Sequence, residues 1–201
     1  MEISNKIIRL ATSKDAEAIL NIYAPYIQHT SITFEQDVPS LKDFESRIMD
    51  YLKSWPWLVC EMDGKLAGYA YASRYRERVC YQWSVECSVY IHNDYQQAGL
   101  GNVLYEGLMK ILKKQGFINV YAVINLPNPK SVSFHERFGF KWFATYDHVG
   151  FKLGEWKNVG WWQLMLNELA DDPPSPILLE KMDKTFLAPL FDELSKKIKR
   201  T

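Results

Sequence analysis

The chain has 201 residues, of which 47% are hydrophobic, and its 24 basic and 24 acidic side chains leave a formal net charge of zero. This composition predicts a globular chain with one good-sized core. The balanced charge argues against non-specific nucleic-acid binding as the main activity. No apolar run is long enough to span a membrane, and the N-terminus lacks the pattern of a signal peptide.

The cysteines indicate a reducing environment. Cys60, Cys80 and Cys87 are odd in number and match no Cys-x-x-Cys spacing, so free thiols are favoured over disulfides or zinc ligands. We therefore expect a cytoplasmic protein that binds no metal, no nucleic acid and no membrane.

The first half of the chain predicts a strand, two helices and then three strands. Asp63-Gly64 is a strong hairpin turn between two of these strands, and Pro39 and Trp55-Pro56 mark the ends of the second helix. In chain order the elements are a strand at 7–10, a helix that starts at 12–15, a helix at about 40–52, and strands at 57–62, at 66–75 and from Val85 onward.

The second half alternates helices and strands and ends in two strands. The elements are a helix at 101–115 that stops at Gly116, a strand at 119–124, a short helix at 132–138, and strands at 141–146 and 159–166, with a loop rich in Gly and aromatic residues between the last two. Consecutive strands followed by strand-helix-strand crossovers predict an α/β (α+β) fold, with a mixed central sheet of about six to seven strands flanked by helices on both faces.

The C-terminal segment differs from the rest. We expect residues 1–169 to form the main domain and residues 170–201 to form a Pro-rich linker and an amphipathic helical tail, because apolar residues recur there at intervals of four. Pro189 interrupts this pattern and predicts a break near Ala188. The pattern favours a helix packed on its own domain or on a second subunit over a separate binding module.

One hexad carries the most information. Gln96-Gln97-Ala98-Gly99-Leu100-Gly101 follows an alternating strand and opens a helix. Glycines in such a turn let the backbone approach a ligand and direct several free N–H groups at one point, and the positive end of the helix dipole adds to them. The arrangement suits a pyrophosphate, although it matches neither the dinucleotide fingerprint nor the phosphate loop.

At this hexad the chain resembles the GNAT superfamily of N-acetyltransferases, whose hallmark Gln/Arg-x-x-Gly-x-Gly/Ala binds the pyrophosphate of coenzyme A. The resemblance is closest to the phosphinothricin and methionine sulfone acetyltransferase branch, and it covers roughly residues 7–166. The segments that carry it, in order, are ITFE at 32–35, WPWLV at 55–59, YRERVCYQWSVECSVY at 75–90, LPN at 126–128, SVSFHERFGF at 131–140 and GFKLGEWKNVGWWQ at 150–163.

The resemblance implies acetyl-CoA as co-substrate. Its pantetheine arm would pair with the backbone of one strand like an added strand, one amide there would stabilise the thioester oxygen, and the pyrophosphate would lie on the amides of the hexad and its helix. The residues so implied are Val89 (the stabilising amide), Tyr90, Ile91, Gln96, Gln97, Ala98, Gly99, Leu100, Gly101, Asn102, Asn128 and Ser131.

Glu86 is the candidate general base. Strand alternation places it on the opposite face from Val85 and Cys87, which are core residues. A carboxylate near the acceptor takes the proton of an ammonium, directly or through a water. The alternative is a solvated or ion-paired strand carboxylate.

His135 is the candidate general acid. The resemblance places it where many members of the superfamily carry a Tyr that protonates the departing thiolate, and an imidazolium can donate a proton near neutral pH. A structural histidine that caps or packs the short helix is an equal alternative. A route through an acetyl-cysteine is disfavoured, because Cys87 faces the core and Cys80 has no adjacent His.

The acceptor side is implied by resemblance alone. Phe34, Arg76, Arg78 and Tyr81 fall where the branch places residues around its amino-acid substrate, and an Arg can bind a carboxylate or phosphinate through two parallel hydrogen bonds. The alternative is that the two arginines are solvated loop charges. Arg74 stands where relatives often have a smaller residue or Pro, so the shape of the pocket can differ.

We therefore expect an acetyl-CoA-dependent N-acetyltransferase that acts by direct attack on the α-amine of a small amino acid or analogue, of the phosphinothricin or methionine sulfoximine/sulfone type. The alternatives are another amine acceptor (a polyamine, an aminoglycoside or a peptide N-terminus) or a non-catalytic acetyl-CoA-binding module with a protein partner. The branch usually forms homodimers, and the aromatic C-terminal strand and the apolar tail supply surface for one.

Overall fold

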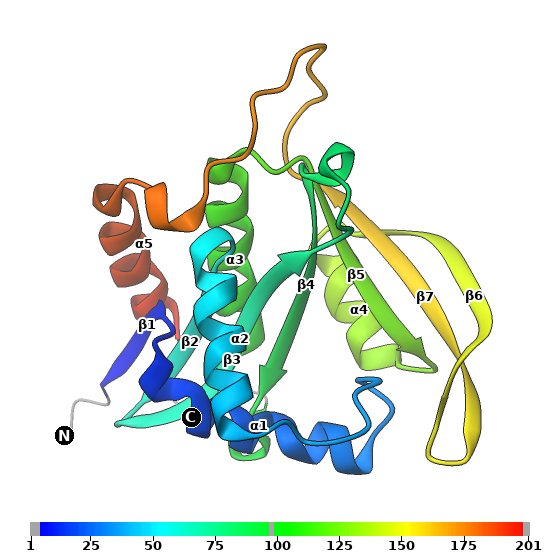
Figure 1. Cartoon of the computed structure of the whole chain (residues 1–201). Helices are drawn as coiled ribbons and strands as arrows, with labels where there is room; N and C mark the ends of the chain where they lie inside the picture. Colours follow the sequence, from blue (N-terminus) through cyan, green and yellow to red (C-terminus); the bar gives the residue numbers. More distant parts are fainter. Residues whose placement is uncertain (1–4, 97–98, 199–201) are drawn as a thin grey trace.

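The computed structural model describes residues 5–96 and 99–198, which form one seven-stranded sheet with helices on both faces (Figure 1). The strands are β1 (Lys6–Leu10), β2 (Trp57–Met62), β3 (Lys65–Arg74), β4 (Ser84–Ile91), β5 (Asn119–Leu126), β6 (Lys141–Lys152) and β7 (Glu155–Met165). The helices are α1 (Ala16–His29), α2 (Leu41–Ser54), α3 (Leu100–Gln115), α4 (Pro129–Arg137) and α5 (Lys184–Lys197).

The strand order is β1-β2-β3-β4-β5-β7-β6. Neighbouring strands are antiparallel except β4 and β5, which are parallel and joined by the crossover helix α3. The predicted mixed sheet, the order of its elements and the Asp63-Gly64 hairpin turn are therefore confirmed.

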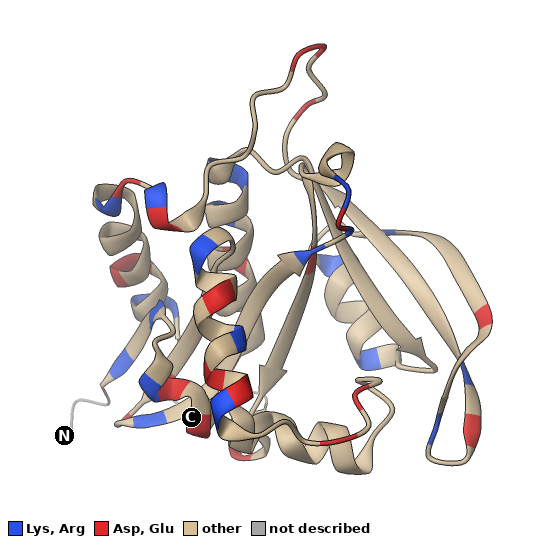
Figure 2. Cartoon of the chain, in the orientation of Figure 1, with Lys and Arg blue, Asp and Glu red and all other residues tan. Residues whose placement is uncertain are grey.

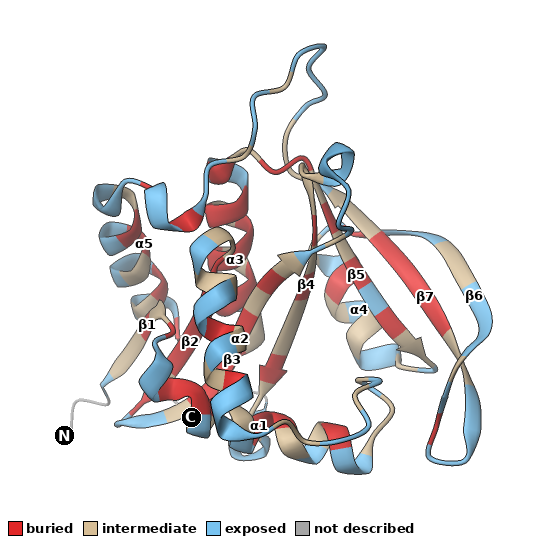
Figure 3. Cartoon of the chain, in the orientation of Figure 1, coloured by how far each residue is buried: buried red, intermediate tan, exposed pale blue. Residues whose placement is uncertain are grey.

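The sheet separates two apolar cores. On one face α1 and α2 cover Trp57, Val59 and Tyr69, whereas on the other face α3 and α5 cover Leu58 and Cys60. Because both faces are covered, β2 is apolar along nearly its whole length instead of alternating. Figure 3 shows this as buried residues along the middle strands, with exposed residues on the outer faces of the helices.

The C-terminal helix α5 covers the edge strand β1, beside α3 (Figure 1). The backbone amide of Ile8 donates to Ser195 Oγ at 2.8 Å, and Leu194 is fully buried. The predicted break near Ala188 is wrong, because α5 runs unbroken through Pro189. Pro189 lies in the second turn, so it removes one early hydrogen bond, and the packing of Leu194 and its apolar neighbours offsets that loss.

The last two strands are longer than the sequence predicts. The segment 147–158, expected as a loop, continues the β6–β7 hairpin, which reverses at Leu153-Gly154 with positive φ at both residues. Its apolar residues Val149, Phe151 and Leu153 alternate with Gly150, Lys152 and Gly154, and all three are exposed. The two glycines within this short run are typical of a turn or loop, so they outweighed the period-of-two signal of a strand.

Charged side chains of both signs are interspersed over the helices and loops (Figure 2). Within residues 5–96 and 99–198, no helix is both long enough and apolar enough to cross a membrane.

Candidate active site

The parallel strands β4 and β5 pair at residues 84–86 with 119–121 and then diverge (Figure 1). Just after β4, the amide of His92 donates to Ala67 O of β3 at 2.9 Å. Successive backbone groups of a strand point to opposite edges, so the amides of Val89 and Ile91 point to the β5 side, beyond the last paired residue. The structure thus leaves the amides of Val89 and Ile91, at two of the expected coenzyme A positions, without a strand partner among the described residues, although Ile91 O accepts from the hydroxyl of Tyr26 at 3.0 Å.

Tyr90, expected between these two positions, is oriented differently. By the same alternation its amide points to β3, and its ring packs against Tyr23 and Tyr69 at centroid distances of 5.0 and 5.3 Å. The side chain of Tyr90 therefore belongs to the core beneath α1 and α2, and it also lines the cavity described next.

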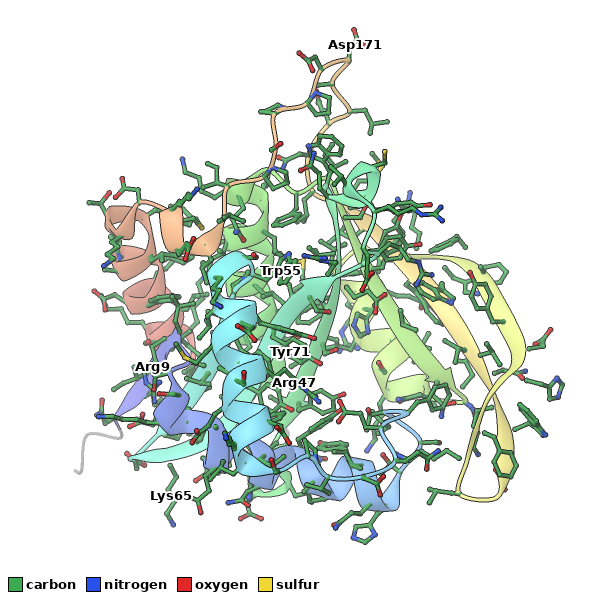
Figure 4. All side chains as sticks on the ribbon, in the orientation of Figure 1. Arg9, Arg47, Trp55, Lys65, Tyr71 and Asp171 are labelled. Carbon is green, nitrogen blue, oxygen red and sulfur yellow. The ribbon has the colours of Figure 1, made fainter. Side chains whose placement is uncertain are left out.

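A cavity of about 270 Å³ lies where β4 and β5 separate. Glu86 and Ser88 line it from β4, Tyr71 from β3, Asn125 from β5 and Phe34 from the loop between α1 and α2. Figure 4 shows Tyr71 between α2 and the diverging strands. This brings together the predicted base Glu86 and one predicted acceptor residue, Phe34.

Two carboxylates, Glu86 and Glu35, line this cavity. Arg47 donates to Glu35 at 2.6 Å, and Tyr23 donates to it at 3.2 Å, so the charge of Glu35 is compensated. Glu86 forms no ion pair within the described part of the chain. Burial raises the pKa of Glu86, and the nearby charge of Arg76 partly offsets that rise. Glu86 is therefore the carboxylate free to accept a proton, with a pKa shifted toward neutrality.

The loop that carries Phe34 is held by the β6–β7 hairpin. The buried ammonium of Lys152 donates to Thr33 O at 2.7 Å, and Gln36 donates to Phe151 O at 3.3 Å. Phe34 lies on Gly150, where an added Cβ would come within 2.5 Å of the phenyl ring. The hairpin thus supports the part of the cavity wall that Phe34 forms.

A second cavity, of about 410 Å³, continues from the first. The two share Ser31, Ile32 and Asn125, and the second also contains Asn128. Asn128 caps α4 by accepting from the amide of Ser131 at 3.2 Å, so both predicted residues lie at the far end of this passage. Asn125 Oδ1 is buried without a hydrogen-bond partner among the described residues, while its Nδ2 donates to Ser31 Oγ at 2.7 Å.

The turn before α3 has the geometry of an anion site. Gly99 adopts φ 72°, and an added Cβ there would meet nothing within 4 Å. The amides of Asn102 and Val103 already donate to Gly99 O, so Leu100 and Gly101 provide the first amides ahead of the helical bonds. The amide of Asn102, which was expected to bind the pyrophosphate, is therefore already engaged in a hydrogen bond within the turn.

Of the three hexad residues that precede this turn, Gln96 is described by the structure. Gln96 donates from Nε2 to Asn93 Oδ1 at 2.9 Å. The predicted contacts Gln97 and Ala98 lie outside the described residues.

His135 lies at the end of a buried chain of polar groups. Its Nδ1 is 2.8 Å from Ser131 O, which can only accept, so Nδ1 carries a proton. Its Nε2 is 2.8 Å from the hydroxyl of Tyr105, which is 2.8 Å from Cys87 Sγ. Burial lowers the pKa of His135, so the neutral imidazole is favoured and Nε2 accepts from Tyr105.

Only one end of this chain reaches the cavity. Cys87 lines the Glu86 cavity, whereas His135 does not. Burial raises the pKa of the Cys87 thiol to about 12, so Cys87 is not an activated thiolate. His135 is therefore connected to the cavity through Tyr105.

The remaining predicted acceptor residues line a separate cavity of about 270 Å³. Arg76, Arg78 and Tyr81 belong to it, beside Ser84 of β4. Ser84 and Glu86 lie on the same face of β4, about 7 Å apart, and the charge of Arg76 acts on Glu86. The structure thus places Arg76 close enough for its charge to act on Glu86, and it places all three of these residues in a different cavity from Phe34.

Sequence reasoning missed three site residues. Ser88 follows from the alternation that selects Glu86 and could have been named. Tyr71 and Asn125 reach the cavity only because β3 and β5 flank β4, a relationship that spacing along the chain does not contain.

Comparisons with known proteins agree with this geometry. The model of the acetyltransferase (GNAT) domain family matches residues 8–161. A phosphinothricin N-acetyltransferase of Streptomyces viridochromogenes is 38% identical over 85% of this chain and 92% of its own length. The L-methionine sulfoximine/L-methionine sulfone acetyltransferase of Salmonella typhimurium is 32% identical over 81% of this chain and 96% of its own length.

A similar solved structure is the GNAT superfamily phosphinothricin acetyltransferase of Sinorhizobium meliloti in complex with acetyl-CoA. Its TM-score is 0.80 at 29% identity, over 85% of this chain and 94% of that one. The chain belongs to the GNAT acetyltransferase family. It is thus an acyltransferase of the class that takes its acetyl group from acetyl-CoA, and the free β4 edge, the passage to Asn128 and the open turn at Gly99 fit that co-substrate.

Proposed function

We propose that this enzyme transfers acetyl from acetyl-CoA to the α-amine of a small amino acid or analogue of the phosphinothricin or methionine sulfone type. The observation that carries the proposal is the carboxylate of Glu86, which forms no ion pair with a described residue and lies in a small polar cavity beside the unpaired amides of β4 and near the charge of Arg76. The named activities of the relatives support the same acceptor class.

Glu86 removes the proton that blocks attack. An α-ammonium has no lone pair, and its proton passes to the Glu86 carboxylate, directly or through a water. Partial burial of Glu86 raises its pKa toward that of the acceptor, which brings the proton affinities of the two groups closer together. The nitrogen lone pair then attacks the carbonyl carbon of the thioester that acetyl-CoA supplies.

The amide of Val89 stabilises the charge that develops on the thioester oxygen. A backbone N–H held at the edge of a strand costs no reorganisation when the charge forms. The carbon–sulfur bond then breaks, and the thiolate takes the second proton that the attacking nitrogen loses as the amide forms. The chain that runs from Cys87 through Tyr105 to neutral His135 supports this side of the cavity, with Tyr105 as the positioning residue.

Arg76 is the candidate partner of the acceptor carboxylate. Its guanidinium lies over the rings of Tyr75 and Trp161, at 4.8 and 5.7 Å from their centroids. No ion pair engages its N–H groups within the described residues. An amino acid with its ammonium at Glu86 therefore has a bidentate cation within reach of its α-carboxylate.

The experiment is thiol release from acetyl-CoA with a panel of amines. The panel contains phosphinothricin, methionine sulfone, unmodified amino acids, a polyamine, an aminoglycoside and a peptide N-terminus. Release that requires a free amino acid or its analogue supports the proposal. Release only with a polyamine, aminoglycoside or peptide contradicts the acceptor class, and no release with any amine despite acetyl-CoA binding contradicts catalysis.

We also propose that the enzyme is a homodimer. The β6–β7 hairpin exposes large apolar side chains, with Trp156 at 61%, Trp142 at 58% and Phe151 at 54% exposure, and a patch of this kind marks an interface. Sedimentation of the parent and of Trp156→Glu tests the proposal. A dimer that the substitution dissociates supports it, and a monomeric parent at micromolar concentration contradicts it.

We propose a cytoplasmic location as well. The three cysteines are free, and Cys60 and Cys87 are buried, which suits a reducing compartment. Fractionation of cells that produce the protein tests this directly.

A further inference from the structure

Helix α1 carries two tyrosines whose hydroxyls serve different parts of the site. Tyr23 and Tyr26 are three residues apart, and both rings pack edge-on against the ring of Tyr90, at centroid distances of 5.0 and 5.1 Å. The hydroxyl of Tyr23 is 2.7 Å from Thr33 Oγ1, in the loop between α1 and α2. The hydroxyl of Tyr26 instead donates to Ile91 O at 3.0 Å, so it acts on the end of β4 and not on the acceptor loop.

The carbonyl of Ile91 belongs to the edge of β4 that β5 leaves uncovered. In an antiparallel strand the N–H and C=O of one residue point to the same edge. The next residue, His92, donates to Ala67 O of β3, so both backbone groups of Ile91 point away from β3, where β5 has already diverged. The Tyr26 hydroxyl thus takes the place of a strand partner for Ile91 O.

Ile91 is also held closely from the β3 side. Gly68 lies opposite Ile91 in the register of β3 and β4. A Cβ added at Gly68 would come within 2.6 Å of Ile91 Cδ1 and 3.0 Å of Tyr90 O, so the absence of a side chain lets the two strands approach. The end of β4 is therefore fixed by β3 on one edge and by Tyr26 on the other.

The same hydroxyl interacts with the start of the hexad. Burial raises the pKa of Tyr26, and its interactions with the backbone of Ile91 and with the side chain of Gln96 oppose that rise. The hydroxyl is therefore protonated at neutral pH and remains a donor. Gln96 is bonded in turn to Asn93 Oδ1 at 2.9 Å. Tyr26 thus connects α1 with the end of β4 and with the first residue of the hexad.

This contact lies beside open space and not in a sealed core. Tyr26 and Ile91 line a groove of about 250 Å³. The groove shares His29 and Thr30 with the passage that contains Asn128, and Figure 1 shows α1 next to the C-terminal end of β4. The bond between Tyr26 and Ile91 is therefore at the surface that the expected coenzyme A positions share.

We propose that Tyr26 is a positioning residue for acetyl-CoA. Its hydroxyl holds the uncovered edge of β4 and the start of the hexad in the relative arrangement that a pantetheine arm and a pyrophosphate require. Such preorganisation reduces the ordering that the ligand must otherwise impose when it binds. The proposal depends on acetyl-CoA as the co-substrate and on the β4 edge as its site, and it is independent of which amine is the acceptor.

The test compares Tyr26→Phe with Tyr23→Phe in the full-length enzyme. Each substitution removes one hydroxyl from α1 and keeps the ring that packs against Tyr90, so the two variants are matched. Calorimetry measures the Kd of CoA, and steady-state kinetics give kcat and the KM of each substrate. Hydrogen–deuterium exchange of residues 88–95, without ligand, measures how firmly the end of β4 is held.

We expect Tyr26→Phe to raise the Kd of CoA and the KM of acetyl-CoA about five- to tenfold, the effect of one lost hydrogen bond. Its kcat at saturation should stay within about twofold of the parent value, and residues 88–95 should exchange faster. Tyr23→Phe should change the KM of the acceptor instead, because its partner Thr33 belongs to the acceptor loop, and it should leave the Kd of CoA within about twofold.

The other outcomes overturn the proposal. Equal increases in the Kd of CoA in both variants would mean that α1 is loosened as a whole. An unchanged Kd in Tyr26→Phe, with or without faster exchange, would leave the hydroxyl a structural role alone, and a raised Kd without faster exchange would indicate direct contact instead of positioning. If no amine is acetylated, the proposed function fails, whereas the Kd and the exchange rates still decide the role of Tyr26.

Discussion

The hydroxyl of Tyr105 lies 2.8 Å from Nε2 of His135 and, on its other side, 2.8 Å from Sγ of Cys87. Tyr105 is fully buried in α3, so this hydroxyl is the link between the imidazole and the wall of the Glu86 cavity. This bond bears on both predicted roles of His135, as general acid and as structural residue, because it connects the imidazole to the cavity wall and also holds the histidine in the core.

We predict that Tyr105→Phe lowers kcat about 10- to 100-fold while leaving the KM of acetyl-CoA within about twofold. The substitution keeps the ring and removes the hydroxyl through which His135 reaches the cavity. It also leaves a buried Nε2 unpartnered, at a cost of about 1–3 kcal/mol in the free energy of unfolding. Steady-state kinetics and urea unfolding measure the two effects.

The control for Tyr105→Phe is Tyr146→Phe, which removes the hydroxyl of an exposed tyrosine on β6. It should change neither quantity. Loss of stability without loss of kcat in Tyr105→Phe would assign the chain to packing alone.

The second prediction concerns the pH dependence of kcat/KM. Glu86 must be deprotonated to act, so the rate falls as pH drops through its pKa, which burial raises and Arg76 lowers. Arg76→Ala removes the lowering influence, and the acid limb of the profile should therefore move to higher pH. Arg78→Ala removes a charge from the same segment that is not among those acting on Glu86, and it should leave the limb in place. An unmoved limb in Arg76→Ala would contradict the assignment of that limb to Glu86.

Lys152→Met tests the support of the cavity wall. The substitution keeps an apolar stem but removes the bond to Thr33 O, worth about 1 kcal/mol. We expect the KM of the acceptor to rise about fivefold, because the loop that holds Phe34 is released, while the KM of acetyl-CoA changes little. Lys141→Met at the exposed start of β6 is the matched control. An equal rise in both KM values would indicate a general loss of structure.

Gly107→Ala tests the docking of α5 on α3. An added Cβ would come within 2.6 Å of Leu194 Cδ1 and 3.1 Å of Leu58 Cδ1, so Leu194 must shift. Overpacking costs about 1–3 kcal/mol, which exceeds the gain of about 0.5–1 kcal/mol from replacing a helical glycine. We therefore expect a net loss of stability in urea unfolding.

The same substitution should be much less destabilising in a Leu194→Ala background, where the closest obstructing atom, Leu194 Cδ1, is absent and only Leu58 Cδ1 at 3.1 Å remains. Additive effects of the two substitutions would mean that α5 does not pack against Gly107 in solution.

The sheet and the position of Glu86 could be predicted because local rules act there without competition. The alternation of β4 identifies Glu86, and the hexad that ends at Gly101 marks the start of α3. The continuation of α5 through Pro189 could not be predicted, since packing against β1 and α3 outweighs a local penalty that the sequence shows plainly.

The sequence also did not predict that the candidate acceptor residues line two different cavities. Phe34 and Arg76 belong to one predicted group, but Phe34 is placed by the β6–β7 hairpin and Arg76 by the segment between β3 and β4. The partnership of Tyr105 with His135 joins two helices that are separated by β5. Contacts of this kind arise from tertiary packing, which spacing along the chain does not encode.

The most direct measurement of the central claim compares the parent with Glu86→Gln in acetyl transfer to phosphinothricin, with the N-acetyl product detected by mass. Glutamine has nearly the same shape and cannot accept the proton. The account predicts product from the parent and a kcat/KM lower by about 10²–10⁴-fold in the variant, with acetyl-CoA binding unchanged. Equal rates in the two proteins would contradict the role of Glu86.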